Sequence, residues 1–302
     1  MVLDALELVS AKVRLLPADS LFPGVGDLPI LECTTAKCRA LIALQGAQLL
    51  SFYPTGEDDL LWLSPLESFE PGKAIRGGIP LCLPWFGLNR RAPELPKHGF
   101  ARNQSWTLDD VAESEGGDLR LSFKFQPCAE DLAIFPWSFT AQLDVLLSDT
   151  LQLTLNVSNE GDKAMPLSFA MHSYFAASAL AELKVAGVTG VEYLDNCQQL
   201  NRFRQDSDLR IAGEVDRVYE SVVGEQIIHD CGRQIVIGGA GCDTVIVWNP
   251  GKILAETIAD VGSHFDEYLC VERGMAFADE LSLAAGEQHR ATMTLAVQRN
   301  AD

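Results

Sequence analysis

The sequence lacks the features that mark membrane and secreted proteins. No stretch approaches the roughly 20 apolar residues that a membrane-spanning helix requires. The first twenty residues carry Asp4 and Glu7 early, and they have neither a basic start nor a continuous apolar run, so they do not resemble a signal peptide. We therefore expect a protein without a membrane partner that works in the cytoplasm.

Basic residues are scarce. Of the 302 residues, 23 are Lys or Arg and 42 are Asp or Glu, which gives a formal net charge of −19. A chain this acidic repels nucleic acids and anionic membranes, and no broad basic face is left to attract them. We expect no nucleic-acid partner, and any anion that the protein binds must be held by a few local cations.

Cysteine pairs and metal-binding clusters are also missing. The eight cysteines are scattered at positions 33, 38, 82, 128, 197, 231, 242 and 270, with no CxxC pair and no zinc-like spacing of Cys and His. This distribution predicts reduced thiols and no metal site, in keeping with the cytoplasm. Cys82 and Cys270 lie in apolar runs, where a thiol packs as a small hydrophobic side chain.

Strands take the place of long amphipathic helices, which the sequence does not contain. The odd positions from Leu119 to Phe125 are apolar and the even positions are polar, as in a half-buried strand. Similar patterns predict strands at 151–157, 244–250 and 291–298. Strands without long helices between them argue against doubly wound and TIM-barrel folds and favour an antiparallel β-sandwich.

No internal repeat and no linker rich in Pro, Gly or Ser divides the chain. Segments 64–73 and 109–118 resemble solvated loops, and 252–261 is the best candidate for a short helix. With 47% hydrophobic residues the chain can bury a large core. We predict an all-β protein in which residues 1–302 form a single sandwich domain.

Two titratable residues stand in apolar surroundings. His172 lies within "SFAMHSYFAAS" (168–178), and Glu272 ends the apolar run of "DEYLCVERG" (266–274). Burial and neighbouring groups can bring the pKa of both side chains near neutrality, where acid and base catalysts work best. Taken alone, each has an ordinary alternative, because core histidines and glutamates at strand ends are common.

A compact basic group lies further upstream. The stretch "KHGFARNQSW" (97–106) contains Lys97, His98 and Arg102, and it follows "RGGIPLCLPWFG", which begins with Arg76. In an acidic chain this group of local positive charges indicates a site for an anion. Each arginine could equally pair with one of the many surface carboxylates.

Six motifs in a fixed order give the chain a resemblance to a known family. They are "RGGIPLCLPWFG", "HGFARNQSW", "MHSYF", "VDRVYE", "VWNP" and "CVERG". In this order they resemble hexose-6-phosphate mutarotases of the aldose 1-epimerase superfamily, from about residue 31 to the C-terminal strand. The resemblance implies a large antiparallel β-sandwich of the galactose-mutarotase type. It also implies an isomerase that interconverts the α and β anomers of a phosphorylated aldohexose without a cofactor.

The resemblance also implies roles for individual residues. His172 is expected to protonate the ring oxygen, and Glu272 is expected to take the proton from the C1 hydroxyl. Asp216 corresponds to an aspartate that binds sugar hydroxyls. Arg76 and Arg102 correspond to arginines at the phosphate end of the substrate.

The roles of two residues in the basic stretch, Lys97 and His98, remain open. Lys97 departs from the family, which often has an uncharged residue before "HGFAR", so this lysine either reinforces phosphate binding or points into solvent. His98 either lines the sugar site or hydrogen-bonds the loop backbone. We include both as substrate-binding residues.

Two other functions remain open at this point. A mutarotase for unphosphorylated aldoses would use Arg76 and Arg102 structurally, and a sugar-phosphate-binding protein would have no activity, since folds outlive their functions. Both catalytic candidates, His172 and Glu272, are present, and this speaks against a silent protein. We expect a small-molecule substrate, a hexose 6-phosphate, as the partner and a monomer as the oligomeric state.

Overall fold

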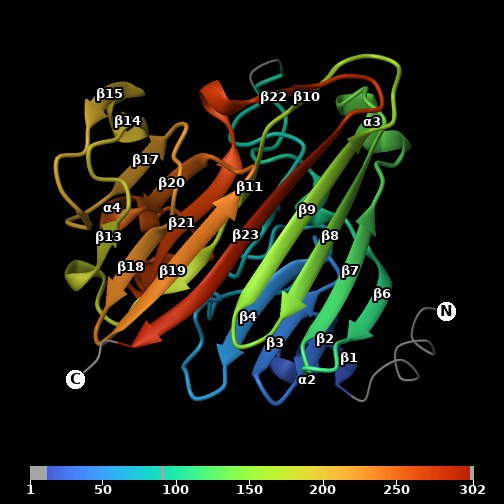
Figure 1. The fold of residues 1–302 in the computed structure, drawn as a ribbon, viewed down its shortest axis with the longest axis horizontal. Coiled ribbons are helices and arrows are strands. Elements are labelled where there is room, and N and C mark those ends of the chain that lie inside the picture. Colours follow the sequence, from blue (N-terminus) through green and yellow to red (C-terminus); the bar gives the residue numbers. More distant parts are fainter. Residues whose placement is uncertain (1–11, 90–91, 300–302) are drawn as a thin grey trace.

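The computed structural model describes residues 12–89 and 92–299, so the prediction made for the N-terminal segment lies mostly outside the described residues. Sheets of nine, eight and four strands and one two-stranded ribbon make up most of the molecule (Figure 1). The strands within them pair antiparallel. The short helices sit in the connections between strands.

The nine-stranded sheet forms the broad face in Figure 1. Its strands, in spatial order, are β16 (Leu209–Arg210), β13 (Lys184–Ala186), β18 (Gln226–Asp230), β19 (Arg233–Ala240), β23 (Gln288–Arg299), β9 (Leu151–Asn159), β8 (Phe139–Leu147), β7 (Leu119–Phe125) and β6 (Thr107–Glu113).

The eight-stranded sheet lies behind it in that view. Its strands, in spatial order, are β15 (Asn201–Arg204), β14 (Glu192–Asp195), β17 (Val215–Tyr219), β20 (Thr244–Asn249), β21 (Tyr268–Met275), β11 (Phe169–Met171) and β5 (Leu81–Cys82), and β12 (Tyr174–Ala176) also pairs with β21.

The remaining elements are short or belong to the N-terminal part. The four-stranded sheet contains β1 (Val13–Pro17), β2 (Pro29–Thr34), β3 (Cys38–Ala43) and β4 (Gln48–Pro54), and the ribbon contains β10 (Met165–Leu167) and β22 (Leu281–Leu283). The helices are α2 (Ala18–Leu21), α3 (Ala129–Ile134) and α4 (Gly251–Ala255), with the 3-10 turns η1 (Ala101–Asn103), η2 (Leu180–Glu182), η3 (Asn196–Gln198), η4 (Gly262–Glu267) and η5 (Phe277–Asp279).

The two large sheets share one apolar core. Phe123, Leu153 and Met293 are buried on one face of the nine-stranded sheet, as the period of two requires. Val247 and Val271 of the eight-stranded sheet belong to the same cluster. Antiparallel sheets packed face to face form a β-sandwich, so the predicted fold class is confirmed.

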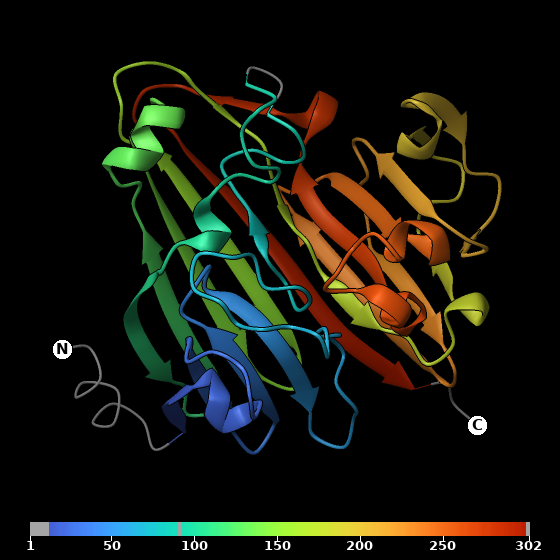
Figure 2. The same cartoon turned by 180° about the vertical axis from the view of Figure 1, so that it is seen from behind.

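The other face of the eight-stranded sheet does not point into this core. Cys82, Ala170, Val218 and Ile246 form a smaller cluster there, with Phe86 packed against it. Figure 2 shows this side of the molecule, where the cyan segment that follows β4 lies between the blue strands and the orange strands. This segment contains the basic stretch of the sequence, so one face of the sheet is left to carry a site.

Most of the local predictions are confirmed. The four predicted strands correspond to β7, β9, β20 and β23, and segment 64–73 has neither strand nor helix. The loop predicted at 109–118 is wrong in its first half, because β6 extends to Glu113. β6 is the edge strand of its sheet and most of its residues are exposed or half-exposed, so it carries no apolar alternation.

The predicted helix at 252–261 is shorter than expected. α4 ends at Ala255, and Thr257 then donates a hydrogen bond from Oγ1 to the carbonyl of Leu254 over 2.7 Å. This turn leads the chain toward Asp260, whose carboxylate meets Arg76. The helix therefore stops where the chain bends back over the sheet.

Candidate active site

Strand register brings His172 and Glu272 together. Met171 of β11 pairs with Arg273 of β21, so the next residue on the first strand faces the preceding residue on the second. Directly opposed residues of an antiparallel pair project from the same face. His172 and Glu272, a hundred positions apart in sequence, therefore lie side by side, with Nε2 of the imidazole 3.4 Å from Oε1 of the carboxylate.

Both side chains are buried, and only some of their polar atoms have hydrogen-bond partners. His172 is 7% exposed and Glu272 is 1% exposed. Neither Nδ1 of His172 nor Oε2 of Glu272 has a hydrogen-bond partner within the part of the chain that the structure describes. Buried polar atoms without partners are costly, and such atoms are found where a ligand is to be bound.

Burial shifts both pKa values away from the charged forms. It lowers the pKa of His172 well below its usual value, and the nearby His98 and Arg102 lower it further. It raises the pKa of Glu272 well above its usual value, with a further contribution from the negative charge of Asp216. A donor and an acceptor with shifted pKa values at one buried point are typical of acid–base catalysis.

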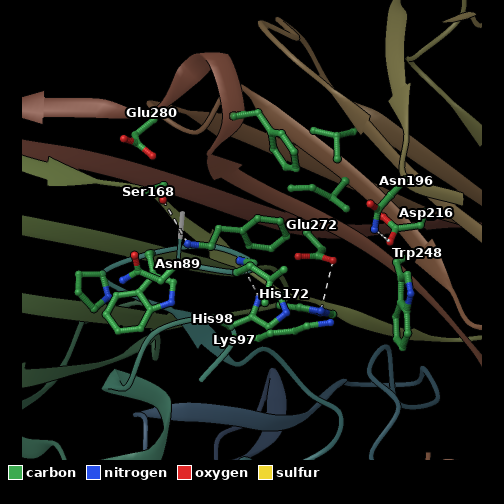
Figure 3. Close-up of a pocket in the computed structure, with 18 of the residues that line it drawn as sticks. Asn89, Lys97, His98, Ser168, His172, Asn196, Asp216, Trp248, Glu272 and Glu280 are labelled. Atoms are coloured by element: carbon green, nitrogen blue, oxygen red, sulfur yellow. Dashed lines mark hydrogen bonds and ion pairs between the residues drawn. The ribbon is translucent and has the colours of Figure 1, made fainter. Parts of the chain in front are cut away.

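The same face of the sheet carries more polar residues in a row. Asp216 of β17 pairs with Trp248 of β20, and Ile246 of β20 pairs with Glu272. Beyond Asp216, the amide of Asn196 donates to the carboxylate, with Nδ2 2.6 Å from Oδ2. In Figure 3 Glu272 lies above His172, and Asp216, Asn196 and Trp248 lie together to the right.

This row forms the floor of a cleft with a volume of about 1060 Å³. The size is at the upper end of the range for small-ligand sites. Phe86, Leu88 and Ile134 contribute apolar parts of its wall, and Glu214 and Glu280 contribute acidic ones. The cleft thus combines apolar surface with a few convergent polar groups.

The loop with the basic stretch forms the opposite wall. Lys97 and His98 both line the cleft (Figure 3). The ring of His98 lies 5.7 Å from the ring of His172, between centroids. Nδ1 of His98 accepts a hydrogen bond of 3.3 Å from the backbone N–H of Gly87. His98 therefore bonds the loop backbone, which is one of the two alternatives that the sequence left open, and it also lines the cleft.

His98 is held in its neutral form. Burial lowers its pKa to about 3, and the charges of Arg102, Lys97 and Arg76 act in the same direction. Because Nδ1 accepts a bond from Gly87, the proton of the neutral ring resides on Nε2. His98 thus offers an uncharged N–H group beside His172.

Arg76 lies at the cleft with two protein partners. Its Nη1 donates to the hydroxyl of Tyr174 over 3.0 Å, and its Nε lies 3.1 Å from Oδ2 of Asp260. The Tyr174 ring in turn stacks on the ring of His172, with centroids 4.8 Å apart. Arg76 is thereby fixed next to the buried pair.

Arg102 is placed differently from Arg76. It is absent from the residues that line the cleft in the described part of the chain, and its Nη2 donates to the carbonyl of Lys97 over 3.1 Å. Its Nε is buried without a partner among the described residues. Of the seven predicted site residues, six therefore line one cleft, and Arg102 holds the loop that carries two of them.

The sequence patterns missed several residues of this cleft. Asn196 and Glu214 lie in no matched motif, and Trp248 was identified only as part of a strand and of the "VWNP" motif. The alternation of β20 could have placed Trp248 on one face, but only the pairing of β14 with β17 brings Asn196 to the site. Register between distant strands leaves no local signal in the sequence.

Neither a metal cluster nor a membrane-spanning helix is found in the described ranges. No three side chains among His, Cys, Asp and Glu come close enough there to hold a metal ion. No helix within residues 12–89 and 92–299 has both the length and the apolar character to cross a membrane.

Comparison with known proteins gives a consistent result. A protein from Cenchrus ciliaris, named as a candidate glucose-6-phosphate 1-epimerase, is 35% identical over 270 residues, which are 85% of this chain and 81% of that protein. A protein of the same name from Escherichia coli is 32% identical and covers 87% of each chain. The crystal structure of YeaD from Salmonella typhimurium, described as a candidate mutarotase, matches with a TM-score of 0.84 and 30% identity, covering 91% of this chain and 92% of that one.

The family model for aldose 1-epimerases matches residues 29–296. This range spans the eight-stranded sheet, the nine-stranded sheet except for the last residues of β23, and all of the cleft-lining residues discussed above. The chain, an isomerase with a sugar substrate, belongs to the aldose 1-epimerase family.

Proposed function

We propose that this protein interconverts the α and β anomers of a hexose 6-phosphate, and that glucose 6-phosphate is its substrate. One observation carries the proposal: His172 and Glu272 face each other at 3.4 Å on the floor of a cleft that also contains cations. The names of the curated relatives, which mention glucose 6-phosphate, support the same substrate.

The reaction needs one proton donor and one proton acceptor. A base takes the proton of the C1 hydroxyl while an acid protonates the departing ring oxygen, C1 then turns about the C1–C2 bond, and the ring closes on its other face. Glu272 serves as the base and His172 as the acid, and closure reverses both transfers. Each transfer contributes about 10² to 10⁴ in rate.

The buried pair is suited to share a single proton. Burial disfavours the charge of His172 and of Glu272 alike, so the unliganded pair holds a neutral imidazole beside a neutral carboxylic acid. Transfer of that proton across the 3.4 Å contact yields the imidazolium and the carboxylate that ring opening uses. In either arrangement one member can donate and the other can accept.

Arg76 and Lys97 provide the positive charge of the cleft. Both line it, together with the carboxylates of Glu214, Asp216 and Glu280. A dianionic phosphate is attracted by the two cations and repelled by the carboxylates, so the charges of the cleft orient the substrate. Arg102 contributes by holding the carbonyl of Lys97, and through it the loop.

A mutarotase for neutral aldoses is the competing function. The contacts of Arg76 with Tyr174 and Asp260 favour it, because an arginine already paired within the protein can be purely structural. The two functions predict different effects of replacing Arg76. In a hexose 6-phosphate mutarotase, the replacement should reduce activity on the phosphorylated sugar more than activity on the neutral sugar.

Exchange spectroscopy by NMR, which measures the rate of α–β interconversion, distinguishes these functions. Wild type and Glu272→Gln are compared on glucose 6-phosphate and glucose, and we expect the variant to lose about 10² to 10⁴ in rate on any accepted sugar. Normal exchange in Glu272→Gln would refute the acid–base assignment. Absence of any catalysed exchange in wild type would refute mutarotation itself.

Arg76→Met tests the phosphate. Loss of a charge-assisted hydrogen bond costs about 1.5–3 kcal/mol, so kcat/KM for glucose 6-phosphate should fall about 10- to 150-fold while that for glucose changes little. Arg210→Met, at an exposed position of the edge strand β16, is the matched control and should leave both values unchanged. Equal losses on both sugars in Arg76→Met would contradict the phosphate role.

Further expectations belong to the same proposal. A single domain is supported by the core cluster that runs from Val13 to Leu295. A cytoplasmic location is supported by the free thiols of all eight cysteines. A monomer stays an expectation, which sedimentation would test.

A further inference from the structure

Asn196 occupies the far end of the polar row. Asp195, the last residue of β14, pairs with Arg217 of β17, so the position after it faces Asp216. The amide nitrogen Nδ2 of Asn196 lies 2.6 Å from Oδ2 of Asp216, and both residues line the cleft (Figure 3). No other hydrogen bond to the Asp216 carboxylate is found among the described residues, so its second oxygen, Oδ1, is left to accept from a ligand.

The connection that carries Asn196 is held in an unusual conformation. Gln199 and Leu200, which follow η3, have φ of 58° and 59°, and both are outside the conformations that side chains other than glycine prefer. Such a conformation is unfavourable for a residue with a side chain. The backbone N–H of Leu200 and the side chain of Gln198 both bond Asp195, each over 2.8 Å. This tight turn fixes the direction in which Asn196 leaves the sheet, and strained backbone of this kind is often found at functional sites.

The order of the side chains across the sheet matches the order of atoms around a pyranose. Passing from β11 through β21 and β20 to β17, the residues are His172, Glu272 and then Asp216, with Asn196 next to it at the end of β14. In the proposed reaction His172 serves the ring oxygen and Glu272 serves the hydroxyl of C1. The next atoms around the ring, away from the ring oxygen, are C2 and C3. Beyond Ile246 and Trp248 of β20, the next hydrogen-bond acceptors along the row are Asp216 and Asn196.

On this basis, and resting on the proposed function, we infer that Asn196 determines sugar specificity: it orients Asp216 so that the two side chains together bind the C2 and C3 hydroxyls of the hexose. With its N–H donated to Oδ2 of Asp216, the amide keeps its own oxygen, Oδ1, as an acceptor. The carboxylate and the amide then offer two neighbouring acceptors to two neighbouring hydroxyl groups. A site built this way rejects a sugar that lacks one of them.

A neutral amide is the group that this position requires. The charged groups that act on Asp216 are Glu214, which directly precedes β17, Asp195 of β14, Glu272 of β21 and Lys97 from the loop. Burial and the carboxylates raise its pKa, and the hydrogen bond from Asn196 opposes that shift. An aspartate at 196 would add another negative charge and remove the donor. Asn196 therefore favours the ionised form of Asp216, which acts as an acceptor, and also orients the carboxylate.

The test compares glucose 6-phosphate with 2-deoxyglucose 6-phosphate by NMR exchange. We expect wild type to prefer the 2-hydroxylated sugar about 10- to 150-fold, which corresponds to one hydrogen bond to a charged group. In Asn196→Ala and Asn196→Asp, kcat/KM for glucose 6-phosphate should fall about tenfold or more, and that for the 2-deoxy sugar, which has only the contact to its C3 hydroxyl to lose, should fall less. The preference of these variants for the 2-hydroxylated sugar should therefore be smaller than that of wild type. Asn201→Ala, on the exposed strand β15 of the same hairpin, should keep the wild-type preference.

The pH profile adds a readout that a merely structural role would not change. Removing the amide donor raises the pKa of Asp216 further, so the acid limb of kcat/KM for glucose 6-phosphate should move to higher pH in Asn196→Ala. An unchanged preference for the 2-hydroxyl in both variants, or no such preference in wild type, would overturn the inference while leaving the mutarotase function intact. Wild type without activity on either sugar would instead overturn the function and the inference with it.

Discussion

The proposed chemistry of this site depends on two side chains that hold one proton between them. The burial that lowers the pKa of His172 also raises that of Glu272, so each side chain is neutral under conditions in which an exposed one would be charged. A pair with one proton contains both a donor and an acceptor. A pair with two protons lacks the acceptor, and a pair with none lacks the donor.

The pH dependence of the rate follows from this count. As pH falls through the lowered pKa of His172, the pair takes up a second proton and loses its base. As pH rises through the raised pKa of Glu272, it loses its only proton and its acid. We expect a bell-shaped kcat/KM with an acid limb below 6.5, the ordinary imidazole value, and an alkaline limb well above 4.5, the ordinary carboxyl value.

The measurement is NMR exchange over a pH series, with the spontaneous rate at each pH subtracted. Glucose and glucose 6-phosphate are both followed, because the phosphate group itself titrates near pH 6 and would otherwise distort the acid limb. A rate that already falls as pH drops through 6.5 on both sugars would mean that His172 has an ordinary pKa, contrary to the effect of its burial.

At the scale of elements, the loop that carries Lys97 and His98 is fixed by backbone contacts. His98 and Gly99 both have φ of 68°, and the N–H groups of Phe100 and Ala101 both donate to the carbonyl of Leu83 over 3.1 Å. A Cβ on Gly99 would collide with that same oxygen. The loop can approach Leu83, which directly follows β5, this closely only because residue 99 has no side chain.

Gly99→Ala should therefore destabilise the protein strongly. The clash with backbone adds to the cost of the left-handed conformation, and we expect a loss of about 2 kcal/mol or more in the free energy of unfolding, measured by urea titration. Gly117→Ala is the matched control, because Gly117 has φ of 80° but a methyl group there would meet no described atom within 4 Å. Its loss should be about 1 kcal/mol. Equal losses in the two variants would show that the close approach to Leu83 is unimportant.

At the scale of the whole molecule, the sandwich assigns different tasks to the two faces of the eight-stranded sheet. One face, with Val247 and Val271, packs into the shared core, and the other, with Asp216 and Glu272, forms the floor of the cleft. Neighbouring strands hold the site residues at fixed spacing, so the site is as rigid as the sheet. The geometry of the site therefore depends on the stability of the core that packs against the other face of the sheet.

The free cysteines give a test of the whole fold. All eight thiols are free, and five of them, Cys33, Cys38, Cys82, Cys242 and Cys270, are buried. A thiol reagent should titrate Cys128, Cys197 and Cys231 in the native protein and all eight thiols in denaturant, and reductant should not change Tm. Rapid reaction of more than the three exposed thiols under native conditions would contradict the described packing.

Local patterns in the sequence predicted the strands that have one face in the core and the other in water. Alternation along Leu119–Phe125 marks a strand with one face in the core and one in water, and β7 occupies that segment. The pattern failed for β6 because an edge strand exposed on both faces has no reason to alternate. The sequence pattern also failed to predict where α4 ends. The helix stops at Ala255, and Asp260, which contacts Arg76, lies beyond it.

By itself, the sequence determined the strand periodicity, the acidic surface with its local cations, and, through ordered motifs, the identity of His172, Glu272 and Asp216 as candidates. Only the tertiary structure decided that these three share one cleft, that Asn196 joins them and that Arg102 lies outside it. The physical reason is register. A side chain's type and its face of a strand are local properties, whereas its neighbours are set by the pairing of strands that are distant in sequence.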